Sequence, residues 1–182
     1  FYLLGGVLGT AAVATVSASR MLLMPIPMLI TAIESVLRPR AAAWIGRREF
    51  GRLTRQLFAL TGLAAAAASA FVVVVFAVRE PLVAAVLRRP IAGLDLLLPC
   101  WGVVFLAQTL RTNVTIVLQG LERFDVLFWL TLVRATVSFA LGYAGMVVLG
   151  APGILVGLAV GEVVYVAVGA IVARERLRAA RR

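Results

Sequence analysis

Two arginines lie inside stretches that are otherwise apolar enough to span a membrane, and they are the best candidates in the chain for a functional site. They are Arg111 and Arg134. An ionisable side chain in hydrocarbon costs at least about 2.5–3.5 kcal/mol, so it normally faces a bundle interior or a watery cavity. Small polar residues recur at helical spacing beside each arginine: Gln108, Thr112, Thr115 and Gln119 around Arg111, and Thr131 and Ser138 around Arg134. We therefore predict that the two arginines hold an anionic group.

The two arginines are expected to converge on one ligand. They lie on consecutive antiparallel segments, and at 1.5 Å per residue both are roughly 10–12 Å from the same membrane surface. Guanidinium groups suit bidentate recognition of phosphate. The predicted substrate cavity is lined by these six residues: Arg111, Arg134, Gln108, Thr115, Thr131 and Ser138. The alternative is snorkelling, in which each arginine extends along its helix to the headgroups.

Two acidic residues also fall within apolar stretches. Glu162 lies in the middle of GLAVGEVVYV, where it is either a cation or proton site or the counter-ion of an arginine. Glu34 precedes Arg38 by four residues, the spacing of a helical ion pair. Both are therefore candidates for a coupling site or for a counter-ion.

Residue usage argues against metal, cofactor or catalytic chemistry. The chain has no histidine, and Cys100 is its single cysteine. A histidine-based triad, an imidazole metal site and an intrachain disulfide are thereby excluded. The clustered acids Glu122 and Asp125 flank Arg123 in a short turn and are interpreted as a solvated loop. We expect no enzyme activity, no metal and no cofactor.

The elements that position these residues are predicted to be membrane helices. Hydrophobic residues make up 63% of the chain and the mean hydropathy is +1.05, well above the roughly 45–50% apolar usage of soluble domains. Since a crossing takes about 20 apolar residues, we predict an all-α polytopic bundle of about six spans. They are Phe1–Val16, Met21–Leu37, Leu57–Val78, Leu96–Leu118, Val126–Leu149 and Gly153–Ala173. Pro25 and Pro27 are expected to bend the second span.

The arginines predict the orientation of these spans. Twelve arginines fall in the segment 38–55, the loop around Glu122 and the C-terminal tail, whereas four fall in the opposite loops. The positive-inside rule then places the first set and the C-terminus in the cytoplasm, with Phe1 entering from that side and the Glu80–Asp95 loop outside. Residues 38–56 are predicted to form an amphipathic cytoplasmic connector that touches membrane lipids, and residues 174–182 a basic cytoplasmic tail.

Other features of the last span and the tail have simpler interpretations. Gly153, Gly157 and Gly161 repeat every four residues on the last span, a pattern that allows another helix to approach closely. The tail RERLRAARR lacks the aromatic residues that a nucleic-acid site uses for stacking. We therefore expect no nucleic-acid partner.

Three segments carry a resemblance to a known family. They are LITAIESVLRPRAAA, LQGLERFDVLFWLTLVRATVSFALGY and GAPGILVGLAVGEVVY. Together with the basic connector and the glycine-rich final pair, they resemble the C-terminal half of multidrug/oligosaccharidyl-lipid/polysaccharide (MOP) exporters, with the Wzx-type O-antigen flippases of polysaccharide biosynthesis as the most similar branch. The resemblance implies one six-helix lobe of a two-lobed transporter in the bacterial inner membrane. Its cargo would be undecaprenyl-diphosphate-linked sugar, and its partner the N-terminal lobe of the same protein.

Several alternatives remain open at this point. A cation-coupled multidrug exporter of the same superfamily would use cavity carboxylates, and Glu162 keeps that possibility alive. A membrane-embedded glycosyl- or phosphotransferase would need acids clustered near an interface. A scaffold without transport activity would need neither feature.

Overall fold

The computed structural model of the protein describes residues 2–86 and 93–181, and this part of the chain consists of helices joined by short turns, without strands. The helices are α1 (Tyr2–Leu22), α2 (Pro25–Gly46), α3 (Phe50–Ala77), α4 (Arg79–Val86), α5 (Leu94–Gly120), α6 (Phe124–Leu149) and α7 (Ala151–Arg181). The predicted all-α membrane bundle is therefore confirmed.

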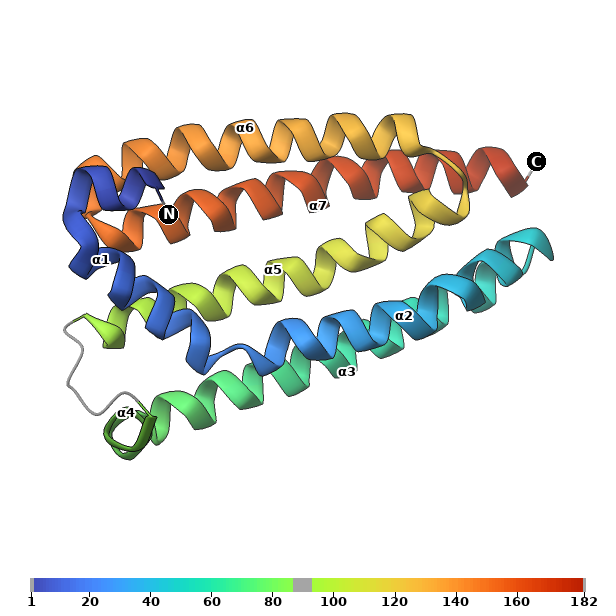
Figure 1. Ribbon diagram of the computed structural model, residues 1–182. Coiled ribbons are helices and arrows are strands. Elements are labelled where there is room, and N and C mark those ends of the chain that lie inside the picture. Colours follow the sequence, from blue (N-terminus) through green and yellow to red (C-terminus); the bar gives the residue numbers. More distant parts are fainter. Residues whose placement is uncertain (1, 87–92, 182) are drawn as a thin grey trace.

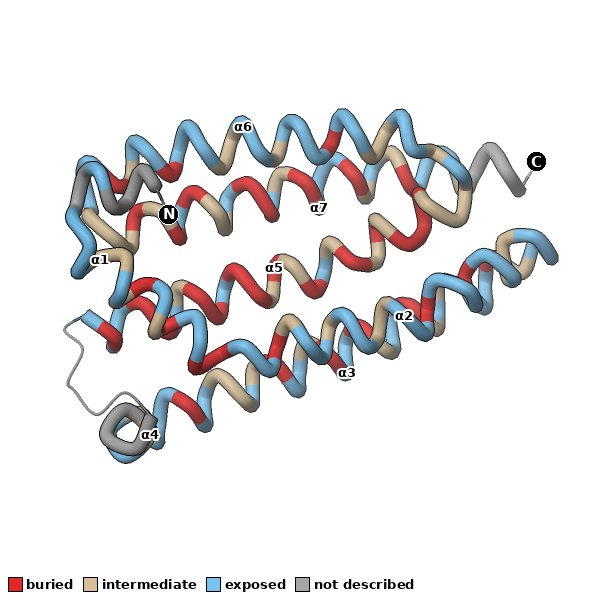
Figure 2. The backbone as a smooth tube through the Cα atoms, viewed as in Figure 1, coloured by how far each residue is buried: buried red, intermediate tan, exposed pale blue. Residues whose placement is uncertain are grey.

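Helix α5 forms the centre of the bundle. The helices α2, α3, α5, α6 and α7 run lengthwise, with α5 between the α2–α3 pair and the α6–α7 pair (Figure 1). Half of the apolar window of α5 is buried, compared with 11% for α6, and buried positions recur along α5 in Figure 2. Helix α5 can therefore bring polar groups from both pairs into contact, while α6 leaves most of its surface to the surrounding lipid.

The number of complete spans is lower than the six predicted. Among the described residues, four helices are long and apolar enough to cross a membrane, namely α3, α5, α6 and α7 up to Leu177, and a bent pair raises the number to five if it forms one span. That pair replaces the first two predicted spans: the part of α1 from Gly9 to Leu22 and helix α2 meet at a bend of 53°. Because Pro25 and Pro27 have no amide hydrogen, the carbonyls of Met21 and Leu23 accept from the amides of Met24 and Ile26 instead. This tightened turn replaces the predicted loop between two full crossings.

The bend also changes where the chain enters the bundle. The N-terminal helix α1 lies at the end that carries α4 and the α6–α7 turn, opposite the C-terminus (Figure 1). We predicted that Phe1 enters from the cytoplasmic side, the side of the C-terminus; losing one crossing moves the start of the chain to the other end. Phe1 itself lies outside the described residues.

The predicted connector at residues 38–56 is not a separate helix. Helix α2 continues through Pro39 to Gly46, three residues form a turn in which Arg48 takes a φ of 59°, and α3 begins at Phe50. Leu37 and Ala41 of α2 are buried, as are Leu53 and Leu57 of α3, all in one apolar cluster. Because this cluster reaches almost to the turn, both helices extend into the segment that was assigned to the connector.

The three basic segments lie at one end of the bundle. Figure 1 shows the α2–α3 turn, the α5–α6 turn and the C-terminus together at that end. The predicted tail at residues 174–182 continues α7 as helix as far as Arg181. The grouping agrees with the positive-inside argument, and the side of the membrane on which this end lies stays a prediction.

Glycines hold α6 and α7 in direct backbone contact. A Cβ atom added at Gly145 would lie 2.6 Å from the carbonyl oxygen of Gly153, and one added at Gly157 would overlap the backbone of Gly142. A Cβ atom at Gly161 would overlap the hydroxyl of Ser138. The close approach predicted for the glycine repeat of the last span is confirmed, and its partner is α6.

Candidate functional site

Glu162 of α7 is buried between the two arginines of the neighbouring helices. Its side chain is 2% exposed. One carboxylate oxygen, Oε1, accepts a hydrogen bond from Arg134 Nη1 of α6 at 2.7 Å, and the other, Oε2, lies 3.2 Å from Arg111 Nε of α5. Three helices thus meet in one cluster of charges, which we call the arginine–glutamate triad (Arg111, Arg134 and Glu162).

Local packing explains why these side chains meet. Gly161 places the backbone of α7 against Arg134 O and Ser138 of α6, which brings the next residue, Glu162, level with Arg134. On the α5 side, the hydroxyls of Thr115 and Tyr165 lie 3.2 Å apart. The guanidinium of Arg111 sits 5.9 Å from the centre of the Tyr165 ring, within range of a cation–π contact.

The triad lies deep in the bundle. Arg111 is nine residues from the end of α5, and Arg134 is ten residues from the start of α6. At 1.5 Å per residue these positions are about 13–15 Å from the helix ends, several turns inside the bundle. Both guanidinium groups turn to Glu162 rather than to the helix ends, so snorkelling does not describe this structure.

The charges of the triad do not cancel. Two guanidinium groups and one carboxylate leave one positive charge in excess. The side chains of Arg111 and Arg134 are 31% and 25% exposed, so part of each remains accessible. Arg134 Nε and Glu162 Oε2 are buried, and neither has a hydrogen-bond partner among the described residues. The triad therefore keeps both positive charge and donor capacity.

The other predicted cavity residues are distributed unevenly around the triad. Thr115 touches it through Tyr165, and Ser138 packs beside Gly161 one residue from Glu162. Gln108 lines a different cavity, and Thr131 is exposed on α6 and takes no part in the ion pairs. The structure therefore brings Thr115 and Ser138 to the arginines but not Gln108 or Thr131.

The cavity at Gln108 is a second polar feature that the sequence analysis missed. It measures about 310 Å³ and lies between α1, α5 and α7, with Arg20 and Trp101 in its wall. The indole of Trp101 donates to the hydroxyl of Ser19 at 3.1 Å, and the Arg20 guanidinium lies 5.8 Å from the centre of the Trp101 ring. The polar pair Ser19–Arg20, which lies between two apolar runs, was the available signal.

Glu34 is engaged in a separate network on the α2 side of the bundle. One of its oxygens pairs with Arg38 at 2.6 Å, which confirms the predicted helical ion pair. The other accepts a hydrogen bond from Thr112 of α5 at 2.8 Å. Close by in sequence, Asn113 accepts from Thr61 of α3 at 2.5 Å. Thr61, one of two hydroxyl residues in a long apolar run, could have indicated this contact.

The described residues contain no group of three or more side chains arranged to hold a metal ion. In the α5–α6 turn, Arg123 donates two hydrogen bonds to Asp125, at 3.0 and 2.8 Å. That bidentate pairing raises the pKa of the Arg123 guanidinium above its usual value. The carboxylate of Asp125 is thus occupied by an ion pair, which fits the predicted solvated loop.

The fold and the triad define a multi-pass α-helical membrane protein with a positively charged site inside the bundle. The family model MatE matches residues 1–144. The chain therefore belongs to the MatE family, and so to the MOP superfamily of membrane transporters, as the resemblance predicted. The match ends within α6 and does not include Glu162. No curated protein and no solved structure matches the chain.

Proposed function

We propose that the protein translocates an anionic lipid-linked oligosaccharide precursor across the bacterial inner membrane by alternating access. Undecaprenyl-diphosphate-linked sugar is the proposed cargo. The chain would act as the C-terminal lobe of a Wzx-type flippase, with an N-terminal lobe completing the central cavity and the C-terminus in the cytoplasm. No covalent step is needed, because transport takes place through a conformational change that opens the cavity first to one side of the membrane and then to the other.

The observation that carries the proposal is the charge of the triad. Arg111 and Arg134 share one carboxylate, so the middle of the bundle holds a net positive charge in a region where any charge is unfavourable. An anionic ligand relieves that imbalance and a cationic ligand increases it. Diphosphate is a suitable partner because guanidinium donates paired hydrogen bonds to phosphate oxygens.

The two acidic residues inside the bundle are already paired, which argues against a cation-coupled drug exporter. Glu162 lies between two arginines, and Glu34 pairs with Arg38 and accepts from Thr112. To bind a coupling cation or a cationic drug, either carboxylate would first have to give up these partners. The same observation leaves little free acidic chemistry in the bundle for a transferase reaction.

A translocation assay tests the proposal directly. The full-length protein is reconstituted in proteoliposomes with a fluorescent short-sugar undecaprenyl diphosphate, and inward movement is followed by protection from an impermeant quencher. We expect Arg111→Gln and Arg134→Gln to lower the rate at least about tenfold, as expected for a lost charge-assisted contact. Arg→Lys variants should recover only part of the rate, since lysine lacks the planar fork.

Two controls make the outcome specific. Arg55→Gln changes an exposed arginine at the α2–α3 end and should leave the rate unchanged. Protein abundance is measured for every variant, because a loss of rate that follows abundance would indicate a structural role. Proton-dependent transport of ethidium, with no movement of the diphosphate probe, would replace the proposal by the drug-exporter alternative.

A further inference from the structure

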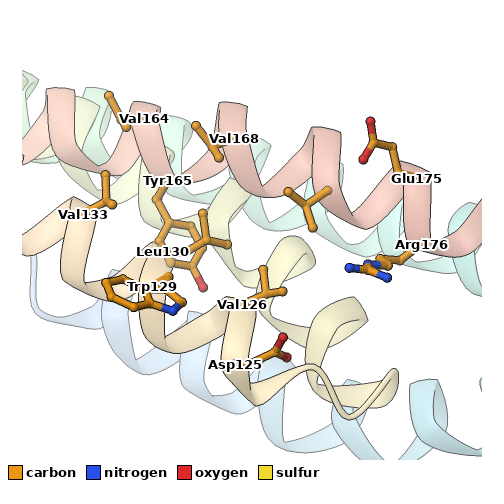
Figure 3. Close-up of a pocket in the computed structure, with 11 residues that line it drawn as sticks. Asp125, Val126, Trp129, Leu130, Val133, Val164, Tyr165, Val168, Glu175 and Arg176 are labelled. Carbon is orange, nitrogen blue, oxygen red and sulfur yellow. The ribbon is translucent and has the colours of Figure 1, made fainter.

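A second site lies between α6 and α7. A groove of about 400 Å³ runs between these two helices, and Figure 3 shows its lining side chains. Most of the lining is aliphatic: Val126, Leu130, Val133, Val164, Val168 and Val172. Tyr165, whose ring lies under the Arg111 guanidinium, is also part of the lining. Trp129, which is 63% exposed, also lines it. Because α6 and α7 are both long and apolar enough to span a membrane, an aliphatic groove between them suits an acyl chain.

Charged groups gather at one end of the groove. Asp125, Glu175 and Arg176 line that end, which Figure 3 shows beyond the aliphatic stretch. It is the end of the bundle that carries the basic segments and the C-terminus (Figure 1). Asp125 is already paired with Arg123. Glu175 and Arg176 are exposed and have no ion pair or hydrogen bond in the described part of the chain.

The length of the groove corresponds to one leaflet of a bilayer. From Val164 to Glu175 the groove follows eleven residues of α7, or about 16 Å at 1.5 Å per residue. Half of a hydrocarbon core about 30 Å thick is about 15 Å. An acyl chain whose headgroup sits at Glu175 and Arg176 would therefore lie along the groove over the depth of a single leaflet.

We propose that this groove binds one acyl chain of a phospholipid whose headgroup carries both a phosphate and a primary ammonium group. Arg176 donates hydrogen bonds to the phosphate, and Glu175 accepts hydrogen bonds from the ammonium. The unpaired groups at the charged end of the groove, Glu175 and Arg176, carry one charge of each sign, and this pair matches a zwitterionic headgroup. A purely anionic headgroup would pair with Arg176 but would leave the carboxylate of Glu175 without a partner. The binding does not depend on the proposed transport function.

Trp129 provides a probe inside the groove. The full-length protein is reconstituted in bilayers that contain a small fraction of lipid with brominated acyl chains, which quench indole fluorescence on contact. The chain has three tryptophans, so the groove signal is the difference between the wild type and Trp129→Phe. We expect brominated phosphatidylethanolamine to quench this signal about fivefold more effectively per molecule than phosphatidylglycerol, the upper range for an exposed ion pair.

Matched variants separate headgroup recognition from general contact with lipid. Arg176→Gln should abolish the preference, whereas Arg174→Gln, two residues away and outside the groove lining, should keep it. Val168→Phe fills the groove and should reduce quenching by either lipid. Val163→Phe adds the same bulk at an exposed position outside the lining and should not.

Three results would overturn the proposal. Equal quenching by both lipids would mean that Trp129 meets only bulk lipid. Stronger quenching by phosphatidylglycerol would assign the site to an anionic lipid. Protection of Trp129 from every brominated lipid would mean that protein covers this face.

Discussion

Replacing Glu162 by glutamine is expected to destabilise the protein more than replacing either of the arginines that surround it. Glu162→Gln keeps the shape of the side chain and removes its charge, which leaves two guanidinium groups inside the bundle without a counter-ion. Arg111→Gln or Arg134→Gln instead leaves a neutral pair of one arginine and Glu162. The triad thus predicts an asymmetry between the acid and its two partners.

The size of the effect follows from burial. Removing one member of a buried ion pair costs about 3–5 kcal/mol because the other charge stays uncompensated. Arg111 and Arg134 are 31% and 25% exposed, so solvent screening lowers our expectation to about 2–3 kcal/mol for Glu162→Gln. For each arginine variant we expect about 1 kcal/mol. At about 2–4 °C per kcal/mol for a chain of this size, these values correspond to roughly 4–12 °C and 2–4 °C.

The measurement is thermal unfolding in detergent, followed by helical circular dichroism at one fixed scan rate, because irreversible unfolding makes Tm depend on the rate. Glu175→Gln removes the same charge from an exposed position of α7 and should shift Tm little. The double variant Glu162→Gln with Arg134→Gln returns the cluster to a net charge of +1 and should recover part of the loss. The reasoning is refuted if either arginine variant is less stable than Glu162→Gln, or if the double variant is the least stable.

Two further predictions concern packing and topology. Gly157→Leu should destabilise the bundle by about 3 kcal/mol or more, since the new side chain meets the backbone of α6. Gly62→Leu, which has open space around it, should not destabilise the protein. Equal Tm values for the two variants would contradict the observed interface. In a protein with Cys100 replaced, a cysteine at Gly46 should be protected from an impermeant thiol reagent in intact cells and one at Pro81 should react; the reverse pattern would invert the orientation.

The sequence was most informative where a single helix carries the whole signal. The glycine repeat of the last span predicted close packing because its period places three glycines on one face of one helix. The ion pair of Glu34 with Arg38 was predictable for the same reason, since four residues separate them. Long apolar runs likewise predicted α3, α5, α6 and α7, although the structure extends these helices beyond the apolar residues.

The features that depend on contacts between helices were harder to predict. Arg111 and Arg134 were expected to converge, and they do, but the anion between them is Glu162 of the chain itself. From the sequence, Glu162 was either a cation or proton site or the counter-ion of an arginine. The choice depends on the rotation of α7 relative to α5 and α6, which is determined by packing at Gly161 and Tyr165. Two apolar runs on either side of Arg20 predicted two crossings, whereas the missing amide hydrogens of Pro25 and Pro27 join them as a bent pair.

The position of Glu162 also constrains how the proposed anionic cargo would be bound and released. A diphosphate that approaches Arg134 competes with a carboxylate already 2.7 Å from Nη1. The competition lowers the affinity relative to two free arginines, and it also keeps the arginines partly neutralised when no cargo is present, which limits the unfavourable free energy of charge in the membrane. Weakening a contact that would otherwise be very tight favours release on the far side. An internal carboxylate between two arginines is therefore suited to transient binding of an anion, as translocation requires.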